Sequence, residues 1–161
     1  MDDLVIRGEH IADIDHIKQL LSDRFKMKEI QELHYILRIE VIWTLDDIMI
    51  SQLHYILNLL FRFGMTECKP IATPLDRNLK LDADSDTEEC EPTNYRKLVR
   101  ILIYLTITRP YLNYPIELLS QFMQTPQNIH VDCVKRMLRY ISGIMDSAIL
   151  YKSATQIRLK G

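Results

Sequence analysis

Residues 66–92 interrupt this chain, and the interruption constrains the fold more than any other feature of the sequence. The segment holds three of the six prolines and a cluster of acidic residues, and no apolar stripe of helical or strand period runs through it. Such a composition is typical of a linker. We therefore expect two parts, 1–65 and 93–161, joined by a proline-rich and acidic linker over 66–92.

The predicted strands are short. Leu4–Ile6 is an apolar run that ends near a glycine, and we interpret it as an edge strand. β-Branched and aromatic residues fill 33–43, and a second such run covers 45–51, which predicts a hairpin with two aspartates near its bend. Two further runs, over 148–151 and 156–159, are expected to form a closing hairpin.

Helices are predicted where apolar side chains recur at spacings of three and four. Ser51 and Gly64 flank one such stripe as typical cap residues, and Thr93 or Asn94 can cap the helix after the linker. Arg109 ends that helix, because a residue before proline avoids the helical region. The predicted helices cover 11–25, 51–63, 95–108, 116–123 and 127–142. A small early sheet and a mainly helical second part define an α+β fold.

Composition places the chain among ordinary globular proteins. Of its 161 residues, 47% are hydrophobic and 26% are charged, which is enough to bury a core. We predict no signal peptide and no membrane span. The three cysteines lie at least 22 residues apart, which excludes CxxC-type zinc sites and a disulfide framework. We therefore expect an intracellular protein, cytoplasmic or nuclear, with reduced thiols.

The charge is distributed unevenly along the chain. Residues 1–92 carry 10 Lys and Arg against 19 Asp and Glu, whereas residues 93–161 carry 10 against 3. One interpretation is two solvated surfaces of opposite sign that attract each other. The other is that the basic half faces an anionic partner, for which nucleic acid is the obvious candidate. The aromatic residues fall at core spacings, so we expect no surface for stacking bases.

Two adjacent carboxylates, Asp2 and Asp3, precede the first predicted strand. Carboxylate oxygens at the end of a strand are how metal-dependent phosphoryl-transfer enzymes hold divalent cations. Successive strand residues point to opposite faces, so these two could share metals only from a tight hairpin. The other strand of such a hairpin is not part of this sequence.

Several stretches, read in order, resemble the C-terminal part of the reverse transcriptase of copia-type LTR retrotransposons. Asp2-Asp3-Leu-Val-Ile is similar to the family's Asp-Asp-Leu-Leu-Ile strand, and Phe25-Lys-Met-Lys is similar to its F-x-M-K-D-L-G segment. The resemblance covers nearly the whole chain with order and spacing preserved. Further similar stretches lie at 34–41, 50–57, 63–74, 95–99, 104–110 and 135–143.

The resemblance implies a fold and a set of functional residues. It implies part of a polymerase palm sheet, made of the hairpin and the edge strand, and a mainly helical thumb or connection lobe. Asp2 and Asp3 would be two of the three carboxylates that hold Mg²⁺ in the intact family, and the hairpin over 34–51 would grip the primer. The basic residues expected to lie near a DNA–RNA hybrid or duplex are Arg96, Lys97, Lys135, Arg136 and Arg139.

Departures from the family pattern predict a loss of activity. Gln31, Arg38 and Arg100 stand where the family favours glycine, and Tyr111 replaces the usual aspartate after Arg-Pro. Pro115 stands where the family continues a helix, and an interior proline costs about 3 kcal/mol. The first metal-binding aspartate, the fingers and the ribonuclease H domain of the family are not in the sequence. We expect a truncated, inactive remnant that holds no cofactor.

Two alternatives of other classes remain open. Arg136-Met137-Leu138-Arg139 fits the RxLR string of secreted oomycete effectors that act in host cells. The chain can also be a domesticated module that binds nucleic acid without polymerising it. Because the palm sheet would present an open edge, we further expect self-association through that edge.

Overall fold

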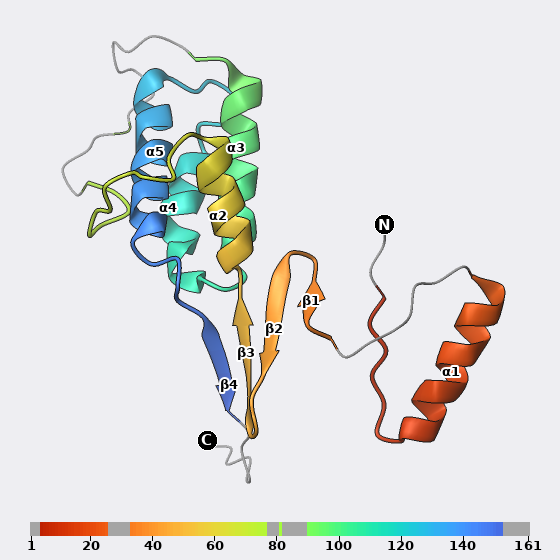
Figure 1. Ribbon diagram of the computed structural model, residues 1–161. Helices are drawn as coiled ribbons and strands as arrows, with labels where there is room; N and C mark the ends of the chain where they lie inside the picture. The colour runs from red at the N-terminus through yellow and green to blue at the C-terminus, as the bar shows by residue number, and fades with distance from the viewer. Residues whose placement is uncertain (1–3, 26–32, 77–80, 82–89, 153–161) are drawn as a thin grey trace, which may run out of the picture.

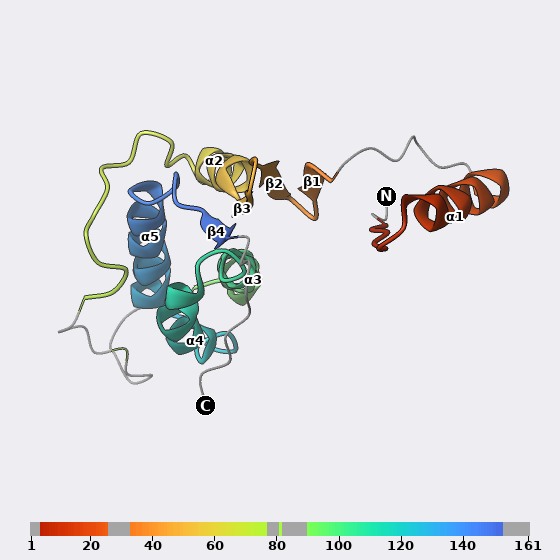
Figure 2. The same ribbon diagram turned by 90° about the horizontal axis from the view of Figure 1, so that it is seen from below.

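A computed structural model describes residues 4–25, 33–76, 81 and 90–152. Four helices pack together above one end of an antiparallel sheet, and a further helix, α1, lies apart from both in two perpendicular views (Figures 1 and 2). The elements are α1 (Ile11–Arg24), β1 (Tyr35–Ile36), β2 (Ile39–Trp43), β3 (Asp47–Ser51), α2 (Leu53–Arg62), α3 (Pro92–Leu105), the short 3₁₀ helix η1 (Pro110–Leu112), α4 (Asn113–Ser120), α5 (Asn128–Ser142) and β4 (Ile149–Lys152). The predicted α+β class is confirmed.

The sheet brings β4, at the end of the described chain, beside strands from residues 35–51. Its strands lie in the order β1-β2-β3-β4, and each neighbouring pair is antiparallel. Strand β4 pairs with β3, so that Ile48 lies opposite Tyr151. The first strand of the predicted closing hairpin, 148–151, corresponds to β4, which also pairs with β3. The second strand of that hairpin, 156–159, lies outside the described residues.

Two of the strand predictions were wrong in detail. Leu4–Ile6 forms no strand, because the sheet of the described residues places no hydrogen-bonding partner beside it. The run 33–43 is two strands rather than one. Leu37 and Arg38 both have positive φ, 47° and 63°, and this pair reverses the chain between β1 and β2 in the manner of a two-residue hairpin turn.

Helix ends follow local capping chemistry. The Glu91 carboxylate accepts hydrogen bonds from the backbone N–H groups of Thr93 and Asn94, so α3 begins at Pro92, earlier than predicted. Gly64, at φ 63°, ends α2 as predicted. The start of α4 also lies earlier than predicted. Pro115 falls within the first turn of α4, where its missing N–H has no intrahelical partner to lose.

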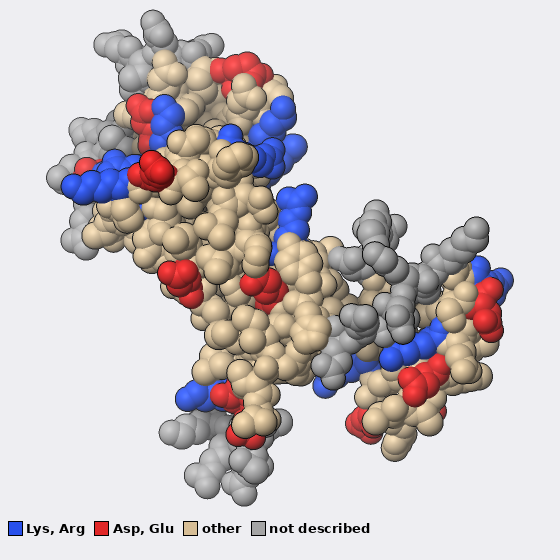
Figure 3. Space-filling view, viewed as in Figure 1, with Lys and Arg blue, Asp and Glu red and all other residues tan. Residues whose placement is uncertain are grey.

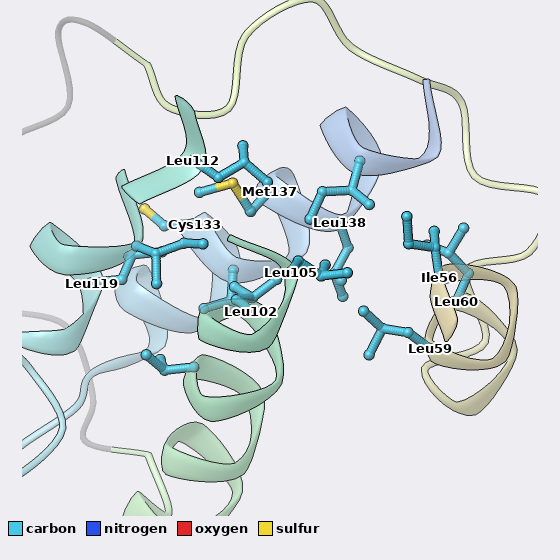
Figure 4. Packing of buried hydrophobic residues seen from close by; sticks show 14 of the residues in the cluster. Ile56, Leu59, Leu60, Leu102, Leu105, Leu112, Leu119, Cys133, Met137 and Leu138 are labelled. Atoms are coloured by element: carbon cyan, nitrogen blue, oxygen red, sulfur yellow. The ribbon is translucent and has the colours of Figure 1, made fainter. Parts of the chain in front are cut away.

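The core lies between α2, α3, α4 and α5. Leu residues from all four helices meet there with Val134, Met137 and Ile141, and most are fully buried (Figure 4). Residues Ile56, Leu59 and Leu60 of α2 belong to the same cluster although they precede the linker segment in sequence. The helices are therefore one packed unit that includes the last element before residue 66.

A chain of buried polar groups connects this helical unit to the sheet. Gln52, at the junction of β3 and α2, accepts a hydrogen bond of 2.7 Å from the hydroxyl of Thr108. That hydroxyl accepts one of 2.8 Å from Nη1 of Arg109, which is itself fully buried. The Nη2 group of Arg109 donates to the carbonyls of Met145 and Ser147, both at 2.9 Å. These last contacts fix the segment that leads from α5 into β4.

We expect Thr108→Val to destabilise the protein by about 1–3 kcal/mol, because it leaves Gln52 Oε1 and Arg109 Nη1 buried without that partner. Thr106→Val is the matched control. Its hydroxyl bonds only the local carbonyl of Ile103 at an exposed position, so its effect should stay within about 0.5 kcal/mol. Urea unfolding measures both, and equal losses for the two variants would contradict the role given to Thr108.

Burial also sets the protonation of His130 at the start of α5. The ring is fully buried, stacks on Phe122 at a centroid distance of 4.0 Å, and accepts a hydrogen bond from the backbone of Gln127 through Nδ1. Burial lowers the pKa of His130 because a cation in that position loses its hydration. The folded state therefore keeps this ring neutral below the pH at which an unfolded histidine becomes protonated.

This lowered pKa predicts a loss of stability in acid. Because the unfolded state binds the proton more readily, the free energy of unfolding should fall as the pH drops below about 6.5, by at most about 1.4 kcal/mol per pH unit. Urea unfolding at pH 7.5 and pH 5.5 measures the difference. His130→Asn should reduce it, and His16→Asn at an exposed position of α1 is the matched control. An undiminished slope in His130→Asn would refute this assignment.

Candidate functional site

A groove lies where the turn between β1 and β2 meets α2 and α3. It consists of two adjoining hollows of about 280 and 380 Å³ that share Arg38, Tyr55 and Ile101. We call it the Arg–Tyr groove. Its remaining lining residues are Tyr35, Leu37, Asn58, Leu59, Arg62, Arg100 and Tyr104.

The backbone of the turn between β1 and β2 is hydrogen-bonded to a side chain of α3. The hydroxyl of Tyr104 donates to the carbonyl of Leu37, and the carbonyl of Tyr104 accepts from Gln52 Nε2 at 3.3 Å. Leu37 and Arg38 are non-glycine residues in the left-handed region, where side chains cost about 1–2 kcal/mol each. The turn therefore projects the Arg38 side chain over the groove at the expense of backbone strain.

Tyr55 occupies the centre of the groove. Its ring meets that of Tyr104 edge to face, with centroids 5.1 Å apart, and the guanidinium of Arg38 lies 5.7 Å from its centre. The phenol donates to the carbonyl of Ile101 at 3.5 Å. Burial raises the pKa of Tyr55 and of Tyr104, so both are neutral phenols at physiological pH. Each presents an aromatic face and a hydrogen-bonding hydroxyl.

The groove is positively charged. Arg38 comes from the β1–β2 turn, Arg62 from the end of α2 and Arg100 from the outer side of α3. No Asp or Glu is among the described residues that line it. Lys and Arg side chains also gather along the α3 side of the helical unit in Figure 3. Three guanidinium groups beside aromatic rings suit a polyanion that carries planar bases.

Sequence reasoning missed most of this groove. Aromatic residues were expected at core spacings only, whereas the fold brings Tyr35, Tyr55 and Tyr104 to one groove although they lie far apart in the chain. Two signals were available. The resemblance had assigned the hairpin over 34–51 to primer gripping, and it had marked Arg38 and Arg100 as residues that replace glycine.

The basic residues predicted on α3 have different surroundings. Arg96 is half-buried and donates from Nε to the carbonyl of Met123 at 2.8 Å, so it holds the turn that follows α4. Lys97 is exposed on the next position of the helix. The predicted carboxylates Asp2 and Asp3 lie outside the described residues. The two predicted cations of α3 therefore differ: Arg96 is bonded within the protein, and Lys97 is exposed.

The basic residues predicted on α5 contact the segment that follows α2. Arg139 Nε donates to the carbonyl of Lys69 at 2.9 Å, and Arg136 Nη2 donates to the hydroxyl of Thr73 at 3.0 Å. Lys135 is exposed and pairs with Asp132 at 3.1 Å. Arg136 and Arg139 therefore hold the first part of the predicted linker against α5.

This placement also bears on the RxLR string. Its two middle residues, Met137 and Leu138, are 0% and 1% exposed, because they face the core from α5. Its two arginines are bonded to the segment around Lys69 and Thr73. A string buried in a core helix gives the effector alternative no support.

The described residues show neither a metal site nor a membrane-spanning helix. They contain no group of three or more His, Cys, Asp or Glu side chains that could hold a metal ion. The donors that the resemblance implies for Mg²⁺, Asp2 and Asp3, lie outside these residues. None of the helices in the described ranges is long and apolar enough to cross a membrane.

Comparison with known proteins agrees with the resemblance. Residues 1–77 match the family described as reverse transcriptase (RNA-dependent DNA polymerase). The retrovirus-related Pol polyprotein from transposon RE2 of Arabidopsis thaliana is 40% identical over 99% of this chain, and that from transposon RE1 is 38% identical over the same share. The Pol polyprotein from transposon TNT 1-94 of Nicotiana tabacum is 31% identical over the whole chain. No solved structure matches significantly.

These matches define the class of protein as a reverse transcriptase relative. More closely, the chain is homologous over nearly its whole length to the reverse transcriptase region of copia-type Pol polyproteins. It spans 11% of the length of the RE2 and RE1 polyproteins and 13% of that of TNT 1-94.

The strained turn beside the groove yields a testable expectation. Leu37→Asn should stabilise the protein by about 0.5–1 kcal/mol, because asparagine tolerates the left-handed region and Leu37 is 63% exposed. Leu45→Asn makes the same change at a fully exposed turn position without positive φ and should be neutral. Thermal unfolding measures both. A loss of stability in Leu37→Asn would show that the turn is not strained.

Proposed function

We propose that this chain is a nucleic-acid-binding segment of a reverse transcriptase and that a DNA–RNA hybrid or duplex lies in the Arg–Tyr groove. The observation that carries the proposal is the convergence of three arginines and three tyrosines, with no acidic side chain among the described lining residues. The homology to copia-type Pol polyproteins supports nucleic acid over other polyanions.

Each part of the groove has a distinct role in this proposal. Arg62 and Arg100 lie on two different helices, so together they can contact phosphates along a strand. Tyr35 is 55% exposed and is available to stack on a base or a sugar, whereas Tyr55 and Tyr104 form the floor. Arg38 lies over the Tyr55 ring and so connects the arginines of the groove with its tyrosines.

The basic residues of the C-terminal half contribute a second, weaker surface. Lys97 and Lys135 are exposed and can meet phosphates by charge, although Lys135 also pairs with Asp132. Arg96, Arg136 and Arg139 already bond backbone or hydroxyl groups within the protein, so their main role in the proposal is to hold the surface in shape.

Polymerisation is not part of the proposal for these 161 residues taken alone. The pair Asp2 and Asp3 would hold Mg²⁺ only with a third carboxylate beside them, and the described residues offer no such cluster. As a relative of retrotransposon Pol polyproteins, the chain is proposed to work inside the cell.

We expect the 161-residue protein to bind a fluorescent DNA–RNA hybrid with an affinity that falls steeply as salt rises, by a slope of about 0.9 per phosphate contacted. Arg62→Gln and Arg100→Gln should each weaken binding to all sequences and lower that slope by about 1, because each removes a phosphate contact. Fluorescence anisotropy titrations at several salt concentrations measure the affinities and the slopes.

Arg7→Gln is the matched control, since Arg7 is exposed in the N-terminal segment away from the groove. Lys97→Gln and Lys135→Gln test the second surface separately. Binding that is weakened by the lysine variants and not by the arginine variants would move the site to α3 and α5. Negligible binding at low salt would overturn the proposal. The same protein should not extend an oligo-dT primer on poly-A with Mg²⁺, and extension would contradict the exclusion of polymerisation.

A further inference from the structure

The tyrosines of the Arg–Tyr groove indicate which form of nucleic acid suits it. In a duplex the bases are paired and stacked on one another, so its outer surface offers phosphates, sugars and base edges but no free ring face. An aromatic side chain stacks on a base only where that base is unpaired. Three tyrosines in one groove therefore favour a ligand with an unpaired nucleotide.

The size of the groove supports the same form of ligand. Its two hollows, of about 280 and 380 Å³, lie near the lower end of the range for pockets that hold one small molecule. A duplex cannot enter a hollow of this size, because its major groove alone is about 12 Å wide. A single nucleotide is a ligand of the right size.

The smaller hollow carries a group for each part of one nucleotide. Tyr55, Asn58 and Arg62 recur at spacings of three and four, so they lie along one face of α2. Tyr35 enters the same hollow from β1 and is 55% exposed. Asn58 is exposed, and its side chain makes no hydrogen bond to another described residue. Its carboxamide offers a donor beside an acceptor, which is the pair that a base edge requires.

The floor of this hollow is ordered by contacts within the protein. The phenol of Tyr55 donates to the carbonyl of Ile101, and its ring packs edge to face on Tyr104. The guanidinium of Arg38 lies over the Tyr55 ring. Because these groups are already held in place, a ligand that binds against them loses little free energy in ordering them.

We infer that an unpaired nucleotide at the end of the bound nucleic acid enters the smaller hollow. The inference rests on the nucleic-acid binding proposed above and names the form of the ligand. The base stacks on Tyr35, and the carboxamide of Asn58 bonds the base edge. Arg62, one turn further along α2, meets the phosphate. The paired part of the hybrid stays outside the hollow, within reach of Arg100.

Hybrids of one sequence with different ends test the inference. The 161-residue protein should bind a fluorescent DNA–RNA hybrid with a short adenosine overhang, at its 3′ or its 5′ end, about 5- to 150-fold more tightly than the blunt hybrid. This range corresponds to the ~1–3 kcal/mol that stacking of one base contributes. An abasic overhang of equal length, which keeps the phosphates and lacks the bases, should lose the gain. Fluorescence anisotropy measures all three affinities.

Variants of the hollow separate stacking from charge. Tyr35→Leu should abolish the gain from the overhang and leave the affinity for the blunt hybrid unchanged, whereas Tyr35→Phe should keep the gain. Asn58→Leu should reduce the gain by about 2- to 12-fold, because it removes hydrogen bonds to the base edge. Tyr151→Leu is the matched control, since Tyr151 on β4 is 54% exposed and does not line the groove.

The outcomes distinguish this inference from the proposed function. Equal affinities for the overhung, abasic and blunt hybrids would overturn the inference and leave the proposed function standing. A gain that survives Tyr35→Leu, or one that Tyr151→Leu abolishes, would overturn it as well, because the base would then bind elsewhere. Negligible binding of all three hybrids at low salt would overturn the proposed function and the inference together.

Discussion

A buried guanidinium holds this fold together. Removing a charge from water costs several kcal/mol, and Arg109 offsets that cost by donating to Thr108 and to backbone carbonyls after α5 rather than to a carboxylate. Those carbonyls belong to the segment that enters β4, and Thr108 leads on to Gln52 at the start of α2. This chain of hydrogen bonds therefore ties the segment that enters β4 to the junction of β3 and α2.

The Arg–Tyr groove depends on that attachment. Gln52 bonds both Thr108 and the carbonyl of Tyr104, so the residue that anchors the sheet also positions one wall of the groove. Tyr104 in turn holds the turn at Leu37, from which Arg38 extends over Tyr55. One connected set of contacts therefore runs from the buried Arg109 to the groove where nucleic acid is proposed to bind.

Much of the fold was predictable from local patterns. The stripes of α1, α2 and α5 and the stop at Gly64 depend on residues close together in sequence, and these were predicted nearly to the residue. The failures have physical reasons. Leu4–Ile6 has strand composition, but a strand needs a partner to bond. The sequence did not predict the turn at Leu37 and Arg38, because neither residue normally adopts positive φ. For the candidate site, charge balance indicated the basic C-terminal half, whereas the groove draws Arg38 and Arg62 from the acidic half.

By itself, the sequence determined the α+β class, the helical stripes and the relationship to copia-type reverse transcriptases. Periodicity and family motifs depend only on residues that are close together in the chain. Tertiary structure alone decided that β4 completes the sheet beside β3, that three distant tyrosines share one groove and that Arg136 and Arg139 bind the segment near Lys69. Each of these depends on contacts between residues tens of positions apart. Such contacts are selected by the packing of the whole chain, and no local pattern specifies them.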